Sequence, residues 1–97
     1  MLESGIERYL VNRVKKMGGL CFKFESPGNP GVPDRIVITA EGRVIFVELK
    51  TDVGRLEKIQ KYRIEEMRKR HVDVRTLKGL NSVKEFLAEI GGGTNGV

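Results

Sequence analysis

Apolar residues recur every three or four positions along the first segment of the chain. Four of them share this spacing: Ile6, Leu10, Val14 and Met17. Such a spacing places them on one face of an α-helix. Gly18 and Gly19 follow directly and favour an end to the helix there. The pattern therefore predicts a helix over residues 3–17.

Three short apolar stretches follow, and their β-branched and aromatic residues predict β-strands. They cover residues 20–24, 34–39 and 43–49. The segment 25–33 holds all three prolines of the chain and is expected to form a stiff loop. The second and third strands are apolar on both faces, which predicts central strands covered by helices. A turn at 40–42 would join these two strands.

The second half of the chain predicts a helix, a strand and a further helix. Helical spacing of apolar residues runs from Leu56 to about His71, with many charges on the other side. Residues 72–77 alternate apolar and polar, as a half-exposed strand does. Gly79 breaks this strand, and Asn81 or Ser82 can cap the last helix.

The predicted order is helix, three strands, helix, strand and helix, which indicates a small α/β domain. At 97 residues the chain is long enough for one compact domain. We expect this domain to span 1–90, with a small mixed central sheet flanked by helices. Residues 91–97 are glycine-rich and are expected to form a disordered tail.

Composition narrows the classes of function and site. Lys and Arg number 18 against 13 Asp and Glu, and a net charge of +5 favours polyanionic partners such as nucleic acid or an anionic membrane surface. One cysteine and one histidine argue against disulfides and zinc sites. The charged N-terminus and the lack of a long apolar run argue against a signal peptide and a membrane span. We expect a cytoplasmic protein, and any metal should be a hard cation held by carboxylates.

Two carboxylates and a lysine lie at the ends of the two central strands. Asp34 opens the first strand, and Glu48 and Lys50 close the next on one shared face, since they are two residues apart. A three-residue turn with Gly42 left-handed would place Asp34 directly across from Glu48. A two-residue turn would place Asp34 opposite Leu49 instead, and the sequence leaves both turns open.

This group of side chains suits the hydrolysis of phosphodiester bonds. Two carboxylates held close together repel each other unless a divalent cation lies between them. Mg²⁺ or Mn²⁺ in that place activates a water molecule and offsets charge on the phosphate. Lys50 can orient the water or stabilise the transition state. The alternative interpretation is a structural salt bridge between Glu48 and Lys50 at a strand end.

Four stretches in this order resemble a known family. They are Gly31-Val32-Pro33-Asp34-Arg35-Ile36, Val47-Glu48-Leu49-Lys50, Gly54-Arg55-Leu56 and Gln60. Together they resemble the VRR-NUC nucleases, a branch of the PD-(D/E)XK superfamily that also includes many restriction enzymes and junction resolvases. The resemblance covers roughly residues 3–90. It implies a restriction-endonuclease-like αβββαβ core with a C-terminal helix.

The resemblance also implies a role for each matching position. The implied metal ligands for Mg²⁺ or Mn²⁺ are the side chains of Glu7, Asp34 and Glu48 and the backbone carbonyl of Leu49. The implied catalytic residues are Asp34, Glu48, Lys50 and Gln60. The implied contacts with nucleic-acid phosphates come from Lys23, Arg35 and Arg55. Glu3, one turn before Glu7, remains an alternative for the metal site.

A metal-dependent DNA endonuclease is the function that the resemblance implies. Little of the chain is left for reading bases, so recognition would depend on phosphate contacts and DNA shape. Size and family favour branched DNA, above all Holliday junctions, in the replication or repair of a bacterial or phage-infected cell. A homodimer would supply two active sites. The alternatives are a catalytically silent DNA-binding module and a nuclease subunit that needs a partner helicase.

Overall fold

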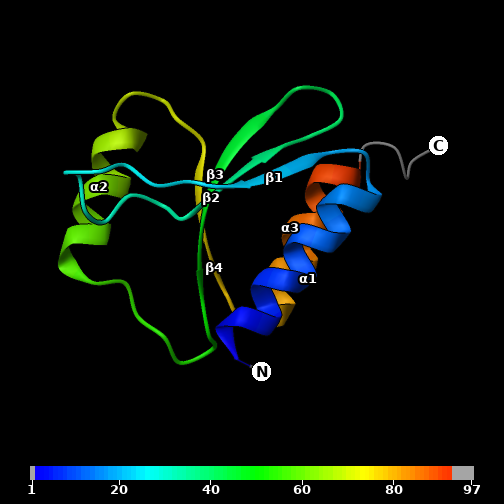
Figure 1. The fold of residues 1–97 in the computed structure, drawn as a ribbon, viewed down its shortest axis with the longest axis horizontal. Coiled ribbons are helices and arrows are strands. Elements are labelled where there is room, and N and C mark those ends of the chain that lie inside the picture. The colour runs from blue at the N-terminus through cyan, green and yellow to red at the C-terminus, as the bar shows by residue number, and fades with distance from the viewer. Residues whose placement is uncertain (1, 93–97) are drawn as a thin grey trace.

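A computed structural model describes residues 2–92 as a four-stranded sheet with helices on both of its faces (Figure 1). The elements are α1 (Glu3–Lys16), β1 (Leu20–Lys23), β2 (Arg35–Ile38), β3 (Val44–Lys50), α2 (Lys58–Arg68), β4 (Val74–Lys78) and α3 (Gly79–Gly92). The element order and the α/β class predicted from the sequence are confirmed. No helix within the described range is long and apolar enough to cross a membrane.

The sheet is mixed, with its strands in the order β1-β2-β3-β4. The first three strands form an antiparallel meander, and β4 lies parallel to β3. A parallel pair needs a crossover connection, which α2 provides. This topology makes β2 and β3 the central strands, as their apolar composition predicts, and leaves β1 and β4 at the edges.

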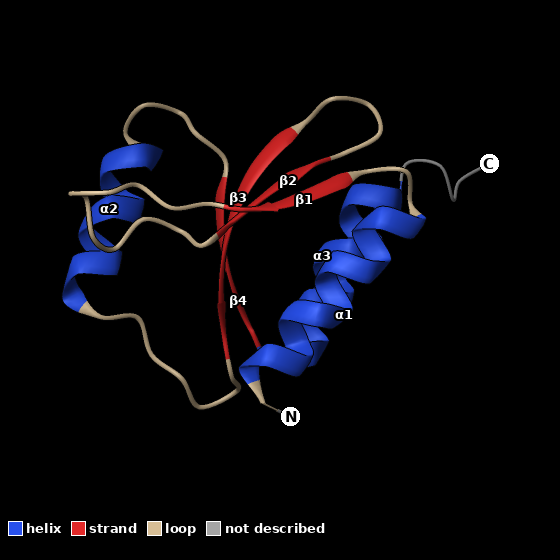
Figure 2. Cartoon of the chain, viewed as in Figure 1, coloured by secondary structure: helices blue, strands red, loops and turns tan. Residues whose placement is uncertain are grey.

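Helices α1 and α3 cover one face of the sheet (Figure 2). The predicted stripe on the first helix is buried there, because Ile6, Leu10 and Val14 are at most 1% exposed. Side chains of the central strands meet this stripe and form the core with it: Val37, Ile45, Val47 and Leu49. The alternation of side chains along each strand thus assigns one face to the core.

On the opposite face, coverage is incomplete. Helix α2 packs against β4 on this side, where Ile64 and Val74 are buried. At the other side of the same face, Leu20, Phe22 and Val44 are 50%, 52% and 50% exposed. The prediction that helices cover both faces of the central strands is therefore wrong for this part of the hairpin. A single helix of 11 residues is too short to cover four strands.

The turn between β2 and β3 determines which side chains meet. The amide of Thr39 donates to the carbonyl of Arg43 at 2.9 Å, so the turn between them has three residues. Gly42 has a φ of 93°, a left-handed conformation that glycine adopts readily. Arg35 lies opposite Val47. Continuing this register by one residue places Asp34 across from Glu48, as the three-residue turn predicts.

Two element boundaries in the second half differ from the prediction. Helix α2 is shorter than residues 56–71. Helix α3 begins at Gly79, so the predicted cap at Asn81 or Ser82 is wrong. The φ of Gly79 is 80°, which lets the chain pass from β4 into the helix without a loop.

The C-terminal boundary also differs from the prediction. Helix α3 runs through Gly91 to Gly92, so the expected tail at 91–97 is wrong for its first two residues. Helical hydrogen bonding, once started in α3, continues into these glycines despite their low intrinsic preference for helix. The remaining tail residues, 93–97, lie outside the described residues.

Candidate active site

Three elements bring four of the predicted side chains to one end of the hairpin. Asp34 directly precedes β2, Glu48 and Lys50 belong to β3, and Gln60 lies in the first turn of α2. The Gln60 amide donates from Nε2 to Glu48 Oε2 at 3.1 Å. Lys50 Nζ lies 3.8 Å from the same carboxylate oxygen. The predicted grouping of Glu48 with both Lys50 and Gln60 is thus present in the fold.

Gln60 is held at both ends of its amide group. While Nε2 donates to Glu48, its Oε1 accepts the backbone amide of Glu57 at 2.8 Å. Glu57 is the N-cap residue of α2, and Gln60 lies three residues later, at the N3 position. The two residues close the first turn of the helix as a capping box. One side chain therefore caps the helix and positions the carboxylate of β3.

The environment of Glu48 favours its neutral form. The pKa of Glu48 is raised from 4.5 to about 7, chiefly by burial and next by the charge of Asp34. The ammonium group of Lys50 and the backbone amide of Asp34 act in the opposite direction. Within the protein alone, the attraction of Lys50 does not compensate the loss of water around this carboxylate.

Asp34 shows the same tendency and carries an unsatisfied atom. Burial is the largest cause that raises the pKa of Asp34, and the charge of Glu7 is the second largest. Its Oδ1 is buried and has no hydrogen-bond partner among the described residues. A buried polar atom without a partner costs free energy of about 1–3 kcal/mol, and more when it is charged. A nearby cation or hydrogen-bond donor would therefore stabilise this oxygen.

These donors fit a hard divalent cation. Mg²⁺ prefers oxygen ligands, keeps several of its waters and usually takes one or two carboxylates from the protein. Asp34 and Glu48 provide two carboxylates across the hairpin, and both have raised pKa values that a nearby positive charge would lower. Within residues 2–92, no three His, Cys, Asp or Glu side chains gather closely enough to hold a metal ion.

Glu7 is placed differently from the predicted third ligand. Its Oε2 accepts a hydrogen bond from Arg35 Nε at 2.8 Å, and this ion pair is half-buried between α1 and β2. The structure therefore brings Glu7 to Arg35 and does not complete a carboxylate trio with Asp34. The alternative carboxylate, Glu3, raises the pKa of both Asp34 and Glu48 by its charge. Its charge thus acts on both members of the pair, although on Asp34 the charge of Glu7 is the larger cause.

The predicted phosphate contacts lie on three separate segments. Lys23 is exposed on β1, directly beside Arg35, and its charge lowers the pKa of Asp34. Arg35 is committed to Glu7, which leaves less of its guanidinium for a phosphate. Arg55 is exposed in the loop before α2. The structure brings Lys23 close to the carboxylates, but it assigns Arg35 a structural partner.

The proline-rich loop before Asp34 is fixed to α2. Arg63 donates from Nε to the carbonyl of Pro30 at 2.9 Å. Gly31 has a φ of 90°, and a Cβ there would lie 2.6 Å from the carbonyl oxygen of Ile59. The sequence places Arg63 in a basic run on the helix surface and predicts neither its contact with the loop nor the close approach at Gly31. The loop and α2 therefore position Asp34 and Gln60 together.

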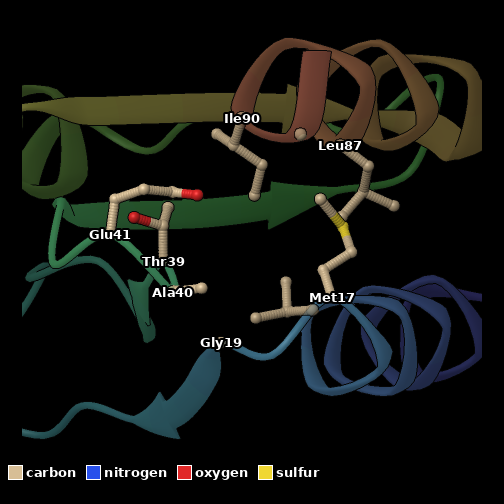
Figure 3. A pocket seen from close by; sticks show the side chains of 9 residues that line it. Met17, Gly19, Thr39, Ala40, Glu41, Leu87 and Ile90 are labelled. Atoms are coloured by element: carbon tan, nitrogen blue, oxygen red, sulfur yellow. The ribbon is translucent and has the colours of Figure 1, made fainter. Parts of the chain in front are cut away.

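A separate pocket lies at the other end of the sheet. It has a volume of about 220 Å³ and contains none of the predicted site residues. Figure 3 shows its lining from the hairpin turn, the end of α1 and the end of α3: Met17, Gly19, Thr39, Ala40, Glu41, Leu87 and Ile90. Because these side chains are mostly apolar and include a single carboxylate, the pocket is a poor site for phosphodiester chemistry.

Comparison with known proteins assigns the family. A family model described as the VRR-NUC domain matches residues 10–81, which include Asp34, Glu48, Lys50 and Gln60. The chain belongs to the VRR-NUC family. A solved structure described as "VRR_NUC domain" has a TM-score of 0.82 and 29% sequence identity, over 88% of this chain and 92% of that one.

Two further comparisons agree with this assignment. A "VRR_NUC domain protein" shares the fold with a TM-score of 0.73 and 18% identity, over 93% of this chain and 88% of its own. "Putative nuclease p44" of Acyrthosiphon pisum secondary endosymbiont phage 1 is 54% identical over 48 residues, which are 50% of this chain and 52% of that protein. This VRR-NUC chain thus spans about half the length of the curated relative that it matches. It carries a nuclease domain.

Proposed function

We propose that this VRR-NUC chain is a metal-dependent DNA endonuclease that hydrolyses phosphodiester bonds in branched DNA. The observation that supports this most is the pair formed by Asp34 and Glu48. One carboxylate has a buried oxygen without a partner among residues 2–92, and the other has a pKa raised to about 7. Both features are costly in the protein alone and are relieved by a divalent cation.

The side chains of Asp34 and Glu48 and the backbone carbonyl of Leu49 would hold Mg²⁺ or Mn²⁺, which supplies an activated water and offsets charge on the phosphate. A carboxylate of α1 would complete the metal environment through a bound water. Glu3 is the better placed for this, because it acts on both carboxylates while Glu7 is engaged by Arg35.

The remaining site residues act on the substrate and on Glu48. Lys50, 3.8 Å from Glu48 Oε2, would orient the attacking water and stabilise the charge that develops on the phosphate. Gln60 holds the Glu48 carboxylate in one orientation by its hydrogen bond. Burial of Glu48 and Asp34 keeps bulk water away from this end of the hairpin, which strengthens each electrostatic interaction there.

Contacts with the DNA would depend on phosphates. A net charge of +5 favours a polyanion, and the described fold uses its elements for the core and the site. Lys23 and Arg55 are the exposed candidates, and Arg35 would contribute only if it leaves Glu7. Recognition by backbone and shape favours branched DNA, with Holliday junctions as the leading candidate. A homodimer acting in replication or repair in the cytoplasm would supply two sites for paired cuts.

Cleavage of labelled linear duplex, flap and four-way-junction DNA with Mg²⁺ or Mn²⁺ tests the proposal. We expect paired cuts in the junction that chelator abolishes. Equal cutting of all three substrates would retain the chemistry and contradict the preference for junctions. DNA binding without any metal-dependent cutting would favour a silent binding module. Cutting that appears only after a helicase is added would instead indicate a nuclease subunit.

A further inference from the structure

A groove of about 380 Å³ lies between α1 and α3. The two helices run side by side on one face of the sheet (Figure 2). The volume of the groove lies within the range of about 300–1,000 Å³ that is usual for ligand pockets. We call it the α1–α3 groove. Six residues line it: Tyr9, Arg13, Lys16, Met17, Lys84 and Leu87.

Half of this lining is apolar and adjoins the core. Leu87 is buried and belongs to the core cluster, and Tyr9 packs against that cluster. Met17, the C-cap residue of α1, is 38% exposed. An exposed apolar surface with a polar rim is typical of an interaction site. These three side chains thus offer a short apolar surface on which side chains of a partner can be buried.

The other half of the lining is cationic and has no carboxylate to balance it. Arg13, Lys16 and Lys84 are exposed, and no residue that lines the groove is acidic. Within residues 2–92, none of the three forms an ion pair. The guanidinium of Arg13 lies instead over the ring of Tyr9, 5.3 Å from its centroid. By contrast, Arg75 on β4 pairs with two carboxylates.

Helix stability explains only part of this positive charge. Arg13 and Lys16 lie in the last turn of α1, where the helix dipole favours cations. They are also three residues apart on one helix face, so they repel each other. Lys84 lies in the second turn of α3, far from the end at which that dipole favours a cation. An anion in the groove would stabilise all three side chains.

We propose that the α1–α3 groove binds an acidic peptide segment of a partner protein. Carboxylates of the segment would lie beside the three cations, and its apolar side chains would pack against the apolar half of the groove. Packed helices lie about 8–10 Å apart, so a groove between two of them admits the side chains of a single peptide. A small apolar centre surrounded by polar contacts is the usual arrangement of a protein–protein interface.

A nucleic acid would use this groove less well. A phosphate backbone is held through its charge and would leave Met17 and Leu87 without a partner. Bases of a single strand stack on free aromatic faces. Here Tyr9 is half-buried, and Arg13 lies over its ring. The observations therefore favour a peptide over a nucleic acid as the occupant.

The α1–α3 groove and the candidate active site lie on opposite faces of the sheet. Gln60 of α2 contacts Glu48 on one face, whereas α1 and α3 cover the other. A partner bound in the groove would thus leave the site open to DNA. This consequence rests on the proposed nuclease function, whereas peptide binding itself does not.

The first test is the binding of a fluorescein-labelled peptide to the full chain, measured by anisotropy in low salt without DNA or metal. The probe is a short peptide in which aspartates surround one leucine and one phenylalanine. We expect saturable binding by the wild type. Lys16→Ala/Lys84→Ala should raise the dissociation constant about tenfold, as for the loss of two exposed ion pairs.

Lys15→Ala/Lys61→Ala is the matched control for this double substitution. Both lysines are exposed on helices and lie outside the lining of the groove, and the same charge is lost. The control should bind the probe nearly as the wild type does. The absence of saturable binding by the wild type, or an equal effect of the control, would overturn the proposal.

Changes in the probe test the apolar half of the groove without altering the protein. Serine in place of the leucine and the phenylalanine should weaken binding about tenfold or more, because apolar burial is lost. Lysine in place of the aspartates should abolish binding. Equal binding of the serine peptide would overturn the proposal. So would displacement of the probe by oligothymidylate or by phosphatidylserine vesicles, because the groove would then accept any polyanion.

Nuclear magnetic resonance locates the bound probe without depending on any variant. Amide shifts should change between Tyr9 and Met17 and around Lys84, and changes confined to the sheet or to α2 would overturn the proposal. Lys16→Ala/Lys84→Ala should also cut DNA at the wild-type rate. Loss of cutting in this variant alone would assign the groove to DNA and overturn the proposal. A wild type that binds the probe and cuts no DNA would count against the proposed function alone.

Discussion

At the scale of single residues, the central feature is a carboxylate that the protein alone holds at a cost. Burial and the neighbouring Asp34 raise the pKa of Glu48 to about 7, against the attraction of Lys50. The proposed nuclease site would gain from this arrangement, because the same burial would strengthen the interaction with a cation and a phosphate. In the metal-free state, the cost of burying the Glu48 carboxylate can be measured as a change in the free energy of unfolding with pH.

Metal-free protein should lose stability as the pH rises through the range set by Glu48. Its folded-state pKa of about 7 lies above the ordinary 4.5, so the folded chain holds a proton that the unfolded chain releases. The stabilisation is complete below pH 4.5 and is lost as the pH rises through about 7. Relative to Glu48→Gln, the free energy of unfolding should fall by on the order of 3 kcal/mol.

Denaturant unfolding with chelator at several pH values measures this difference. Glu25→Gln, a substitution in an exposed loop residue, serves as the control and should follow the wild type throughout. Parallel curves for the wild type and Glu48→Gln between pH 4.5 and 8 would contradict the raised pKa of Glu48.

The two glutamates of α1 should separate by their effects. Glu7→Gln removes a half-buried ion pair with Arg35 and should lower the free energy of unfolding by about 1 kcal/mol. Glu3→Gln should leave stability nearly unchanged, since Glu3 is exposed, but should weaken Mn²⁺ binding several-fold. Denaturation and calorimetric titration measure the two quantities. If Glu7→Gln weakens Mn²⁺ binding and Glu3→Gln does not, Glu7 and not Glu3 belongs to the metal site.

At the scale of elements, the proline-rich loop and α2 behave as one support for the site. Arg63 holds the carbonyl of Pro30, and Gly31 lies against the backbone of Ile59. The loop leads into Asp34, and α2 presents Gln60 to Glu48. A displacement between loop and helix would therefore separate the carboxylates from the amide that positions one of them.

Two glycines of this loop provide a matched test. Gly28 and Gly31 both have a positive φ, 81° and 90°, but a Cβ would meet open space at Gly28 and the backbone of Ile59 at Gly31. Gly28→Ala should cost about 1 kcal/mol of stability from its φ alone. Gly31→Ala should cost about 1–3 kcal/mol more and lower the cleavage rate, because the loop must move. Equal effects on stability and rate would contradict the coupling of loop and helix.

The sequence was sufficient to predict those elements whose structure is determined by local patterns. The spacing of Ile6, Leu10 and Val14 predicts α1, and Gly42 with its three-residue turn predicts the pairing of Asp34 with Glu48. Coverage of a face depends instead on the length of a distant helix. Strand composition alone therefore does not reveal that Val44 is half exposed.

Contacts between residues distant in the sequence could likewise not be predicted from the sequence. Arg35 and Glu7 are 28 residues apart, and nothing in their local sequence indicates that they pair. The start of α3 was missed because Gly79 indicates a break, whereas its positive φ joins strand and helix directly. Such contacts follow from tertiary packing.

At the scale of the whole molecule, the basic charge should dominate DNA binding. Each phosphate contact releases counterions, so affinity falls steeply as salt rises. For about four contacts per homodimer, two from each chain as Lys23 and Arg55 would supply, the dissociation constant for junction DNA should rise about 100-fold between 50 and 200 mM salt. Fluorescence anisotropy with a chelator present measures binding without cutting. An affinity that does not change with salt would contradict recognition through phosphates.

The rate of metal-dependent DNA cleavage by site variants is the direct test of the proposed active site. Asp34→Asn and Lys50→Ala should each lower the rate about 1,000-fold or more, because they would remove a proposed metal ligand and the proposed stabilising cation. Lys78→Ala is the matched control. Lys78 on β4 lies beside Lys50 on β3, and this substitution removes the same charge. We expect this control to keep nearly the full rate. Rates of Asp34→Asn and Lys50→Ala within tenfold of the wild type would contradict the assignment of the active site.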